Sequence, residues 1–413
     1  MFYGLDLHWR FIQVCCIDGG GQKQKEFRVD VTREAIAAFA ERLGPGDAVV
    51  MEATFHTWVV WSLLAPRAGR VVVANPLQVK AIAHARVKTD KVDAHILAQL
   101  LRLDFIPAVE MPSTQTWELR QLVTHRQLLA RKRTAVRNAI HGILHRKLLR
   151  CPHCEPFSAV GRRWLLAQDY TETERLMLDS DLALLDQLER GLETVDARLR
   201  AAAAAEQDVR LLMTIPGVGT TVAVGLLAAI GDIARFATPE KLAAYFGLVP
   251  SISQSGDQCH HGRITKQGRS SARWLAVEAA QSLSQNSTPL AATYHRVKRK
   301  RGHNVAVTAL ARKLVVLVWH VLRNQEPYRY GPVAHTRRKL RQVTPGLAPA
   351  HPGRVPHTLE AVYEEVGLPV PSAPRVAEKR TASVNLSTVT LARKARVCDM
   401  TVKSHKSLAR ARS

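Results

Sequence analysis

The chain has 413 residues, of which 46% are hydrophobic, so it is too long for one ordinary domain and can form two or three hydrophobic cores. Its 59 Lys and Arg residues against 35 acidic residues give a formal net charge of +24, which exceeds what solubility requires and favours a polyanionic partner. The first residues lack the basic segment and long apolar run of a signal peptide, and no stretch approaches about 18 uninterrupted apolar residues. We therefore expect a cytoplasmic, nucleoid-associated protein without a membrane partner.

The first 111 residues have the pattern of an α/β domain. Three short β-rich runs at 2–7, 11–18 and 25–29 precede a helix at 32–43, and strand and helix patterns then alternate. This order predicts an antiparallel meander that passes into parallel β-α-β units, as in a ribonuclease-H-like sheet. A helix is expected over 88–102, and the prolines that follow it close the domain.

Residues 112–205 are predicted to form a helical hairpin or coiled coil. Residues 118–150 contain nine Lys or Arg and one acid, whereas 171–200 contain eight acids and four Arg. In the second segment leucines recur every seven residues, at Leu178, Leu185, Leu192 and Leu199. This repeat fits a hairpin within one chain and a seam between two chains equally well.

A mostly helical domain is expected over 206–330, and the remaining 331–413 differ in composition. This tail contains eight of the twenty prolines and 15 Lys or Arg against five acids. Such a sequence buries little apolar surface, so we expect a largely disordered basic tail, with a possible short helix at 358–366.

Four carboxylates of the first domain form a candidate metal site. Asp6 lies within an apolar strand and Glu52 ends another, while Asp90 and Asp93 are three residues apart on one helix face. An isolated ionised carboxylate is costly in an apolar strand, which indicates that a partner compensates Asp6. Carboxylate oxygens are the ligands of Mg²⁺, and a pair of such ions is suited to phosphodiester chemistry. Taken singly, Asp90 has the position of an ordinary helix cap.

The cysteines give little indication of a structural metal. Six cysteines in a chain of this length do not make a disulfide framework. Cys151 and Cys154 form a lone Cys-x-x-Cys pair, without a second pair at zinc-finger spacing. Cys259 with His260 and His261 likewise has no second ligand pair, so the sequence does not favour zinc at either place.

The segment Thr-Ile-Pro-Gly-Val-Gly at 214–219, followed by an apolar helix, is typical of a helix-hairpin-helix turn. In that interpretation the backbone N–H groups near Gly217 and Gly219 bind phosphate. A simple Pro-Gly turn that opens a buried helix fits the same residues.

Three motifs of the first domain resemble a known family. Gly-Leu-Asp-Leu-His at 4–8, Val-Val-Met-Glu-Ala-Thr at 49–54 and Lys-Thr-Asp-Lys-Val-Asp-Ala at 88–94 resemble, in this order, the RuvC-like DEDD domain of insertion-sequence transposases. The family is the one numbered one hundred and ten, whose members are RNA-guided recombinases. Where that family has Gly after the Glu-Ala-Thr motif, this chain has Phe55 and His56.

The resemblance extends through the second domain, to about residue 330. Ser255-Gly256 precedes a Gly-x-Ile-x-Lys-x-Gly segment at 262–268, as in the family. The resemblance implies that Ser255 attacks a DNA phosphate, together with two Mg²⁺ ions at the carboxylates, and that a structured guide RNA takes part. From the residues alone, Ser255 is a loop serine like its neighbours. After Gly268 this chain has Arg269 where the family has Asn, and Ala272-Arg273 where the family has Leu-Arg.

These features favour a DNA recombinase that forms a dimer or tetramer. The basic residues expected to contact nucleic acid are Arg131, Lys132, Arg133, Arg263, Lys266, Arg269 and Arg273. One alternative is a RuvC-like nuclease without a serine step, and a second is a DNA-binding protein that has lost catalysis. The intact carboxylates argue against the second alternative, because a binding protein has no need to hold four mutually repelling acids together.

Overall fold

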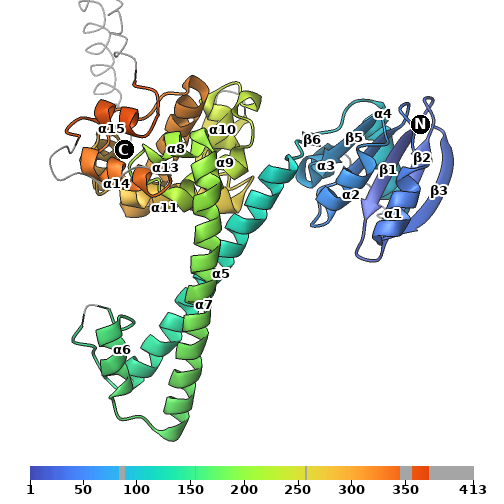
Figure 1. Cartoon of the computed structure of the whole chain (residues 1–413). Helices are drawn as coiled ribbons and strands as arrows, with labels where there is room; N and C mark the ends of the chain where they lie inside the picture. Colours follow the sequence, from blue (N-terminus) through green and yellow to red (C-terminus); the bar gives the residue numbers. More distant parts are fainter. Residues whose placement is uncertain (83–88, 154, 256–257, 345–355, 372–413) are drawn as a thin grey trace, which may run out of the picture. The chain divides into compact units, whose positions relative to one another are not determined.

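A computed structural model describes residues 1–82, 89–153, 155–255, 258–344 and 356–371 of the chain (Figure 1). The N-terminal domain is built on one six-stranded sheet in the order β3-β2-β1-β4-β5-β6. Its strands are β1 (Phe2–Leu7), β2 (Phe11–Ile17), β3 (Lys23–Asp30), β4 (Ala48–Glu52), β5 (Arg70–Ala74) and β6 (Ala108–Val109). The first three strands pair antiparallel, and β1, β4 and β5 pair parallel, which confirms the predicted meander followed by parallel units.

Helices cover both faces of this sheet. On one face, β1 and β4 contribute residues such as Leu5 and Val49 to a core that includes α1 (Arg33–Ala40) and α2 (Thr57–Leu64). On the other face, α4 (Asp90–Arg102) packs across β1, β2 and β4, and its leucines contact Val50 and Val72. The short helix α3 (Pro76–Ile82) follows β5. The N-terminal domain is therefore a mixed α/β layer structure.

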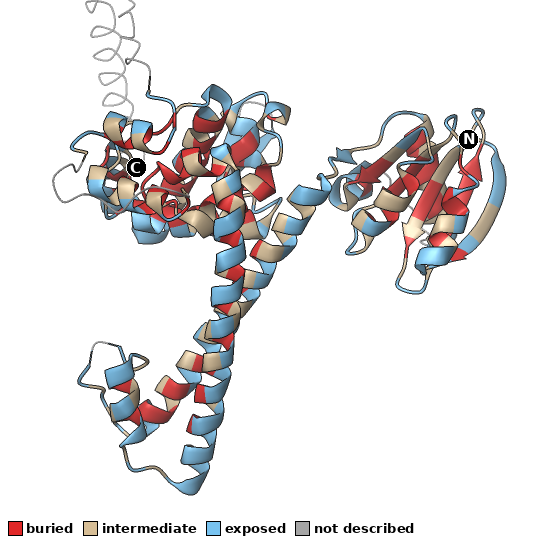
Figure 2. Cartoon of the chain, viewed as in Figure 1, coloured by how far each residue is buried: buried red, intermediate tan, exposed pale blue. Residues whose placement is uncertain are grey.

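Two long helices form the predicted hairpin. α5 (Thr114–Arg146) and α7 (Glu172–Ala205) pack against each other, with α6 (Ala159–Leu166) near the end where they are connected. All four leucines of the seven-residue repeat are buried, and Figure 2 shows the buried positions along both helices. The repeat thus serves packing within one chain.

The remaining elements form a mostly helical domain around one large core. They are α8 (Gln207–Met213), α9 (Thr220–Ile230), the 3₁₀ turn η1 (Ile233–Arg235), α10 (Pro239–Tyr245), the hairpin β7 (Pro250–Ser255) and β8 (Gln258–Ile264), α11 (Ser270–Leu283), α12 (Pro289–Arg301) and α13 (His303–Asn324). Of the helices in the described residues, only α13 is long and apolar enough to cross a membrane. Its residues Leu310, Leu314 and Val318 are fully buried in the helical core, so the core accounts for its composition.

Two helices lie in the tail that was expected to be largely disordered. α14 (Val333–Arg341) and α15 (Leu359–Glu365) are helical, and the second agrees with the short helix predicted at 358–366. Leu340 and Tyr363 are fully buried in the large core, and Arg337 makes a two-pronged ion pair with Glu365. Within the described tail residues, the expectation of disorder was wrong for α14 alone, because a few well-placed apolar residues such as Leu340 are enough to bury one face of this short helix. Residues 345–355 and 372–413 lie outside the described residues.

Candidate functional site

A close contact between α4 and β1 brings Asp90 and Asp93 close to Asp6. A Cβ atom added to Gly4 would lie 1.9 Å from the carbonyl oxygen of Ala94 and 2.6 Å from the nitrogen of Ala98. Only glycine therefore lets the backbone of α4 approach the strand this closely. Because Asp90 and Asp93 lie in the first turn of α4, this contact holds their side chains beside the end of β1.

Asp6 and Glu52 lie on neighbouring parallel strands. Leu5 pairs with Met51, so the next residues of β1 and β4 are at the same level. Leu5 and Met51 point into the core beneath α1 and α2, and since side chains alternate along a strand, Asp6 and Glu52 point to the face covered by α4. The sheet therefore presents both carboxylates to the face where the first turn of α4 lies.

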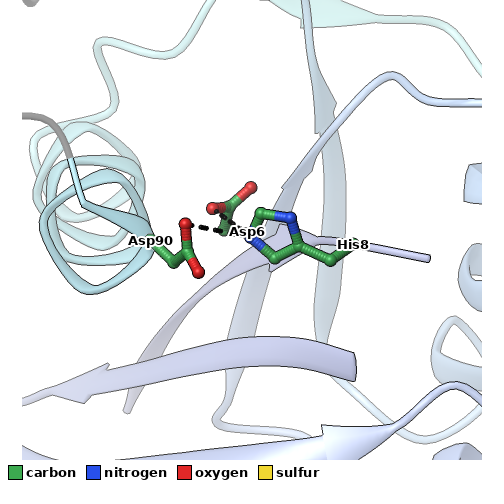
Figure 3. A group of neighbouring side chains, drawn as sticks. All are labelled: Asp6, His8 and Asp90. Carbon is green, nitrogen blue, oxygen red and sulfur yellow. Dashed lines mark hydrogen bonds and ion pairs between the residues drawn. The ribbon is translucent and has the colours of Figure 1, made fainter. Parts of the chain in front are cut away.

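His8 contacts two carboxylates of the cluster (Figure 3). His8 Nε2 lies 3.0 Å from Asp6 Oδ2 and 3.3 Å from Asp90 Oδ1. Within the described residues, the ligand atoms of these three side chains lie within 4.8 Å of one another. His8 was not predicted as a ligand, although it follows β1 directly and lies two residues after Asp6, where the alternation of a strand returns to the same side.

The electrostatics of Asp6 fit a cation site. Burial raises the pKa of the Asp6 carboxyl above its ordinary value, the imidazole of His8 lowers it, and the negative charges of Asp93 and Asp90 raise it again. The carboxylates are therefore close enough to repel one another, which a bound divalent cation would relieve. The donor set of carboxylate oxygens with one imidazole fits a hard or borderline divalent metal.

The loop after Glu52 is well anchored although Phe55 and His56 replace the family's glycine. The hydroxyl of Thr57, which is buried, accepts a hydrogen bond from Thr54 N at 2.6 Å and donates one to the carbonyl oxygen of Glu52 at 3.1 Å. Phe55 is 76% exposed and its ring contacts that of Trp9 at a centroid distance of 5.6 Å. The hydroxyl of Thr57 therefore fixes the end of β4, whereas Phe55 lies on an exposed rim.

Ser255 is the last residue of β7 and is exposed. It pairs with Gln258 of β8, and the two residues between them lie outside the described residues, including Gly256 of the predicted Ser-Gly pair. The hairpin thus places the serine hydroxyl at an exposed tip, where a large substrate has access to it.

The basic residues near this hairpin divide into two groups. Arg263 and Lys266 are exposed, and Lys266 has a left-handed backbone with φ of 54°. Arg273 instead donates to the carbonyl oxygens of Phe246 and Lys266, and Arg269 donates to the Tyr245 hydroxyl. The second pair therefore holds the base of the hairpin, whereas the first pair presents charge to solvent.

The two glycines of the turn between α8 and α9 have different surroundings. A Cβ atom on Gly217 would lie 2.3 Å from the carbonyl oxygen of Ala279, so this glycine serves close packing against α11. Gly219, the N-cap of α9, has open space at that position and lines a cavity of about 230 Å³ with Arg200. The phosphate contact that the sequence suggested thus fits Gly219 better than Gly217.

The tail helix α14 contributes a side chain to the same turn. Lys339 is 8% exposed, and its ammonium donates to the carbonyl oxygens of Ile215 at 2.8 Å and Val218 at 3.1 Å. Burial lowers the pKa of Lys339 to about 7. Sequence analysis assigned Lys339 to a disordered tail, and its spacing gave no sign of this contact.

Much of the positive charge of α5 is paired with acids of α7. Arg126 makes a two-pronged ion pair with Asp196, and Lys147 binds Glu174 at 3.0 Å. Arg131 and Lys132 are exposed, and Arg133 is half-buried. Fewer basic side chains of α5 are therefore free to bind a polyanion than the sequence count indicates. The predicted residues 131–133 are among those that remain.

Comparison with known proteins places both parts of the chain in one family. Residues 3–148 match the IS110-type DEDD transposase domain, and residues 209–296 match the family described as Transposase IS116/IS110/IS902 family. The chain belongs to this transposase family. The two matched regions coincide with the carboxylate cluster of the first domain and the serine hairpin of the second.

Several curated proteins are similar to this chain along most of their length. The transposase for insertion sequence element IS1111A of Coxiella burnetii is 26% identical over 79% of this chain and 91% of its own length. A probable family 20 transposase of Pseudomonas aeruginosa is 27% identical over 79% of this chain and 98% of its own length. The pilin gene-inverting protein of Moraxella bovis is 26% identical over 68% of this chain and 81% of its own length.

Proposed function

We propose that this transposase cleaves and rejoins DNA strands, using the carboxylates Asp6, Glu52, Asp90 and Asp93 to hold divalent metal, with Mg²⁺ as the physiological ion. The observation that carries the proposal is the approach of α4 to β1 at Gly4, which places acids of two elements around His8. The strand order and the covering helices support a ribonuclease-H-like, RuvC-type domain. When bound, a pair of such ions activates the attacking oxygen and stabilises the leaving oxygen.

The protein's own residues supply the position of the metal ligands and the contacts to DNA. The sheet orients Asp6 and Glu52, and the packing of α4 orients Asp90 and Asp93. The exposed residues Arg131, Lys132, Arg263 and Lys266, with Arg133, Arg269 and Arg273 beside them and the N-terminus of α9 at Gly219, are proposed to bind phosphates.

The test of metal-dependent cleavage uses the DNA that flanks the coding region of this chain, labelled at its ends. Wild type with Mg²⁺ is expected to nick this DNA, and Asp6→Ala is expected to bind it and leave it intact. Asp18→Ala is the matched control, because Asp18 is a half-buried acid in the turn after β2 and does not belong to the carboxylate cluster. Full cleavage by Asp6→Ala would refute the carboxylate assignment.

The serine extends the proposal from cleavage to recombination. In the proposed step Ser255 Oγ bonds to a DNA phosphorus, one P–O bond to deoxyribose breaks, and the hydroxyl proton is transferred, through solvent, to the departing oxygen. The resulting phosphoserine diester keeps the energy of the broken bond, so attack by a second DNA hydroxyl reforms a strand and restores the serine. The exposed tip of β7 supports this role, since the serine must reach a duplex.

A guide RNA and an oligomer complete the proposal. The net charge of +24 is large enough to bind RNA as well as DNA, and a second subunit gives a serine domain another route to a metal-bound phosphate. Sequencing nucleic acid that copurifies with the full chain tests the RNA. The nuclease without a serine step is the competing function, and it predicts cleavage with no covalent intermediate.

A further inference from the structure

The end of the helical hairpin formed by α5 and α7 gathers nitrogen and sulfur ligands that the proposed reaction does not use. His141 and His145 are one turn apart near the C-terminus of α5, and four residues of separation puts them on the same helix face. Their ring centroids lie 6.2 Å apart. Two imidazoles at this spacing are a common half of a metal site on a helix.

The chain then reverses and returns to this face. Leu148 has a left-handed backbone with φ of 56°, and the turn is closed by hydrogen bonds from Leu148 N to His145 O and from Leu149 N to Leu144 O. Cys151 and His153 follow the turn. Together with His141 and His145 they line one cavity of about 640 Å³.

We propose that this cavity is a structural zinc site formed by His141, His145, Cys151 and His153. Imidazole nitrogen and thiolate sulfur are the ligands that zinc prefers, and Mg²⁺ prefers oxygen, so this site and the carboxylate cluster select different ions. Four ligands within thirteen residues fit a tetrahedral ion held by one turn. Cys154, which also follows in the sequence, lies outside the described residues.

Binding requires side-chain rotation. Among the described residues, only the group of Asp6, His8 and Asp90 has ligand atoms that all meet within 4.8 Å, so the four ligands of the cavity must turn inward around the ion. Cys151 is half-buried, and the rings of His141 and Phe157 form a T-shaped pair with their centroids 5.4 Å apart. The rotation therefore stays at the surface and leaves the apolar residues beneath it in place.

The ion would stabilise a part of the protein that has little core of its own. The apolar cluster at this end contains nine buried residues, including Ile143, Leu144 and Leu165. Metal ligation is a usual means of fixing segments with so small a core. A zinc ion here would tie the end of α5 to the segment that leads into α6.

The experiment measures metal in the tag-free, full-length protein. After incubation with Zn²⁺ in excess Mg²⁺ and removal of free ions, wild type should retain about one zinc ion per chain. Cobalt in place of zinc should give the intense visible bands of a tetrahedral site with a thiolate ligand. Cys151→Ser and His145→Ala should lose the retained ion, and Cys151→Ser should also lose the thiolate-to-cobalt charge-transfer band.

Control variants show whether the retained ion is bound by these four residues or by other cysteines and histidines of the chain. Cys259→Ser removes an exposed cysteine of β8, and His295→Ala removes an exposed histidine of α12, so both should keep the ion. Asp6→Ala should keep it as well, which distinguishes this site from the carboxylate cluster. The cobalt spectrum is measured on the wild-type protein, so this part of the test does not depend on whether any variant folds. Wild type without retained zinc and without tetrahedral cobalt bands, or equal loss in Cys259→Ser, would overturn the proposal.

Discussion

Gly4→Ala is the most direct structural perturbation of the carboxylate cluster. The new Cβ atom would lie 1.9 Å from the carbonyl oxygen of Ala94, so α4 must retreat by about 1.5 Å to restore an ordinary contact. Because Asp90 and Asp93 move with α4, the ligand geometry opens while all four carboxylates remain in the chain. A misplacement of about 1 Å lowers the rate of a positioned reaction by about 100-fold, and overpacking costs about 1–3 kcal/mol of stability.

The assay compares the rate of Mg²⁺-dependent nicking and the denaturant midpoint for wild type, Gly4→Ala and Gly46→Ala. Gly46 is the matched control, because a Cβ atom added there meets nothing within 4 Å. Gly46→Ala should behave as wild type in both measurements. If Gly4→Ala nicks DNA at the wild-type rate, the approach of α4 to β1 does not set the geometry of the site.

Three further outcomes follow from charge and burial. Asp6→Asn should be more stable than wild type at pH 7 in a chelator, because the raised pKa of the Asp6 carboxyl means that wild type loses stability as pH rises from 3.8 through the folded pKa. Plots of unfolding free energy against pH for the two proteins should therefore converge in acid, and a less stable Asp6→Asn at pH 7 would contradict this. Lys339→Met should lower the free energy of unfolding by about 1–3 kcal/mol, whereas Arg338→Met should leave it unchanged. Since the Lys339 pKa falls from 10.5 to about 7, wild-type stability should rise with pH across that interval and that of Lys339→Met should not, as pH-dependent unfolding would reveal. Replacing residues 131–133 by glutamines should flatten the slope of log K for DNA binding against log salt concentration by about 2–3. Arg126→Gln, which breaks an ion pair with α7, should leave this slope near its wild-type value. An unchanged slope for the triple variant would exclude phosphate contact by residues 131–133.

The sequence predicted the sheet and the hairpin well because both depend on local patterns. The strand at 2–7 coincides with β1, and β-rich runs mark β2 to β5 within one or two positions, whereas the two-residue β6 was not predicted. The seven-residue leucine repeat predicted the buried face of α7, but it did not decide between a partner helix of the same chain and one of another. That choice depends on which helix is nearest in space, which a repeat does not encode.

Features that depend on tertiary contacts were not predictable in the same way. Lys339 finds two backbone carbonyls more than a hundred residues earlier, and Gly217 meets α11. The proposed zinc ligands were not predictable for another reason: a second Cys-x-x-Cys pair is the usual sequence sign of zinc, whereas the residues that line this cavity with Cys151 include His141 and His145 of α5. His8 was quoted in a motif and not considered as a ligand.

The central claim, that Ser255 and the carboxylates act on one DNA phosphate, is tested most directly by trapping the covalent intermediate. End-labelled DNA from the flanks of the coding region is incubated with the full chain and resolved on a denaturing gel, and any protein-linked band is mapped by proteolysis. Wild type with Mg²⁺ should give a band that maps to Ser255 and that is absent in chelator, in Ser255→Ala and in Asp6→Ala, while Ser253→Ala retains it. A protein-linked band in Ser255→Ala, or cleavage by wild type without any such band, would contradict the account.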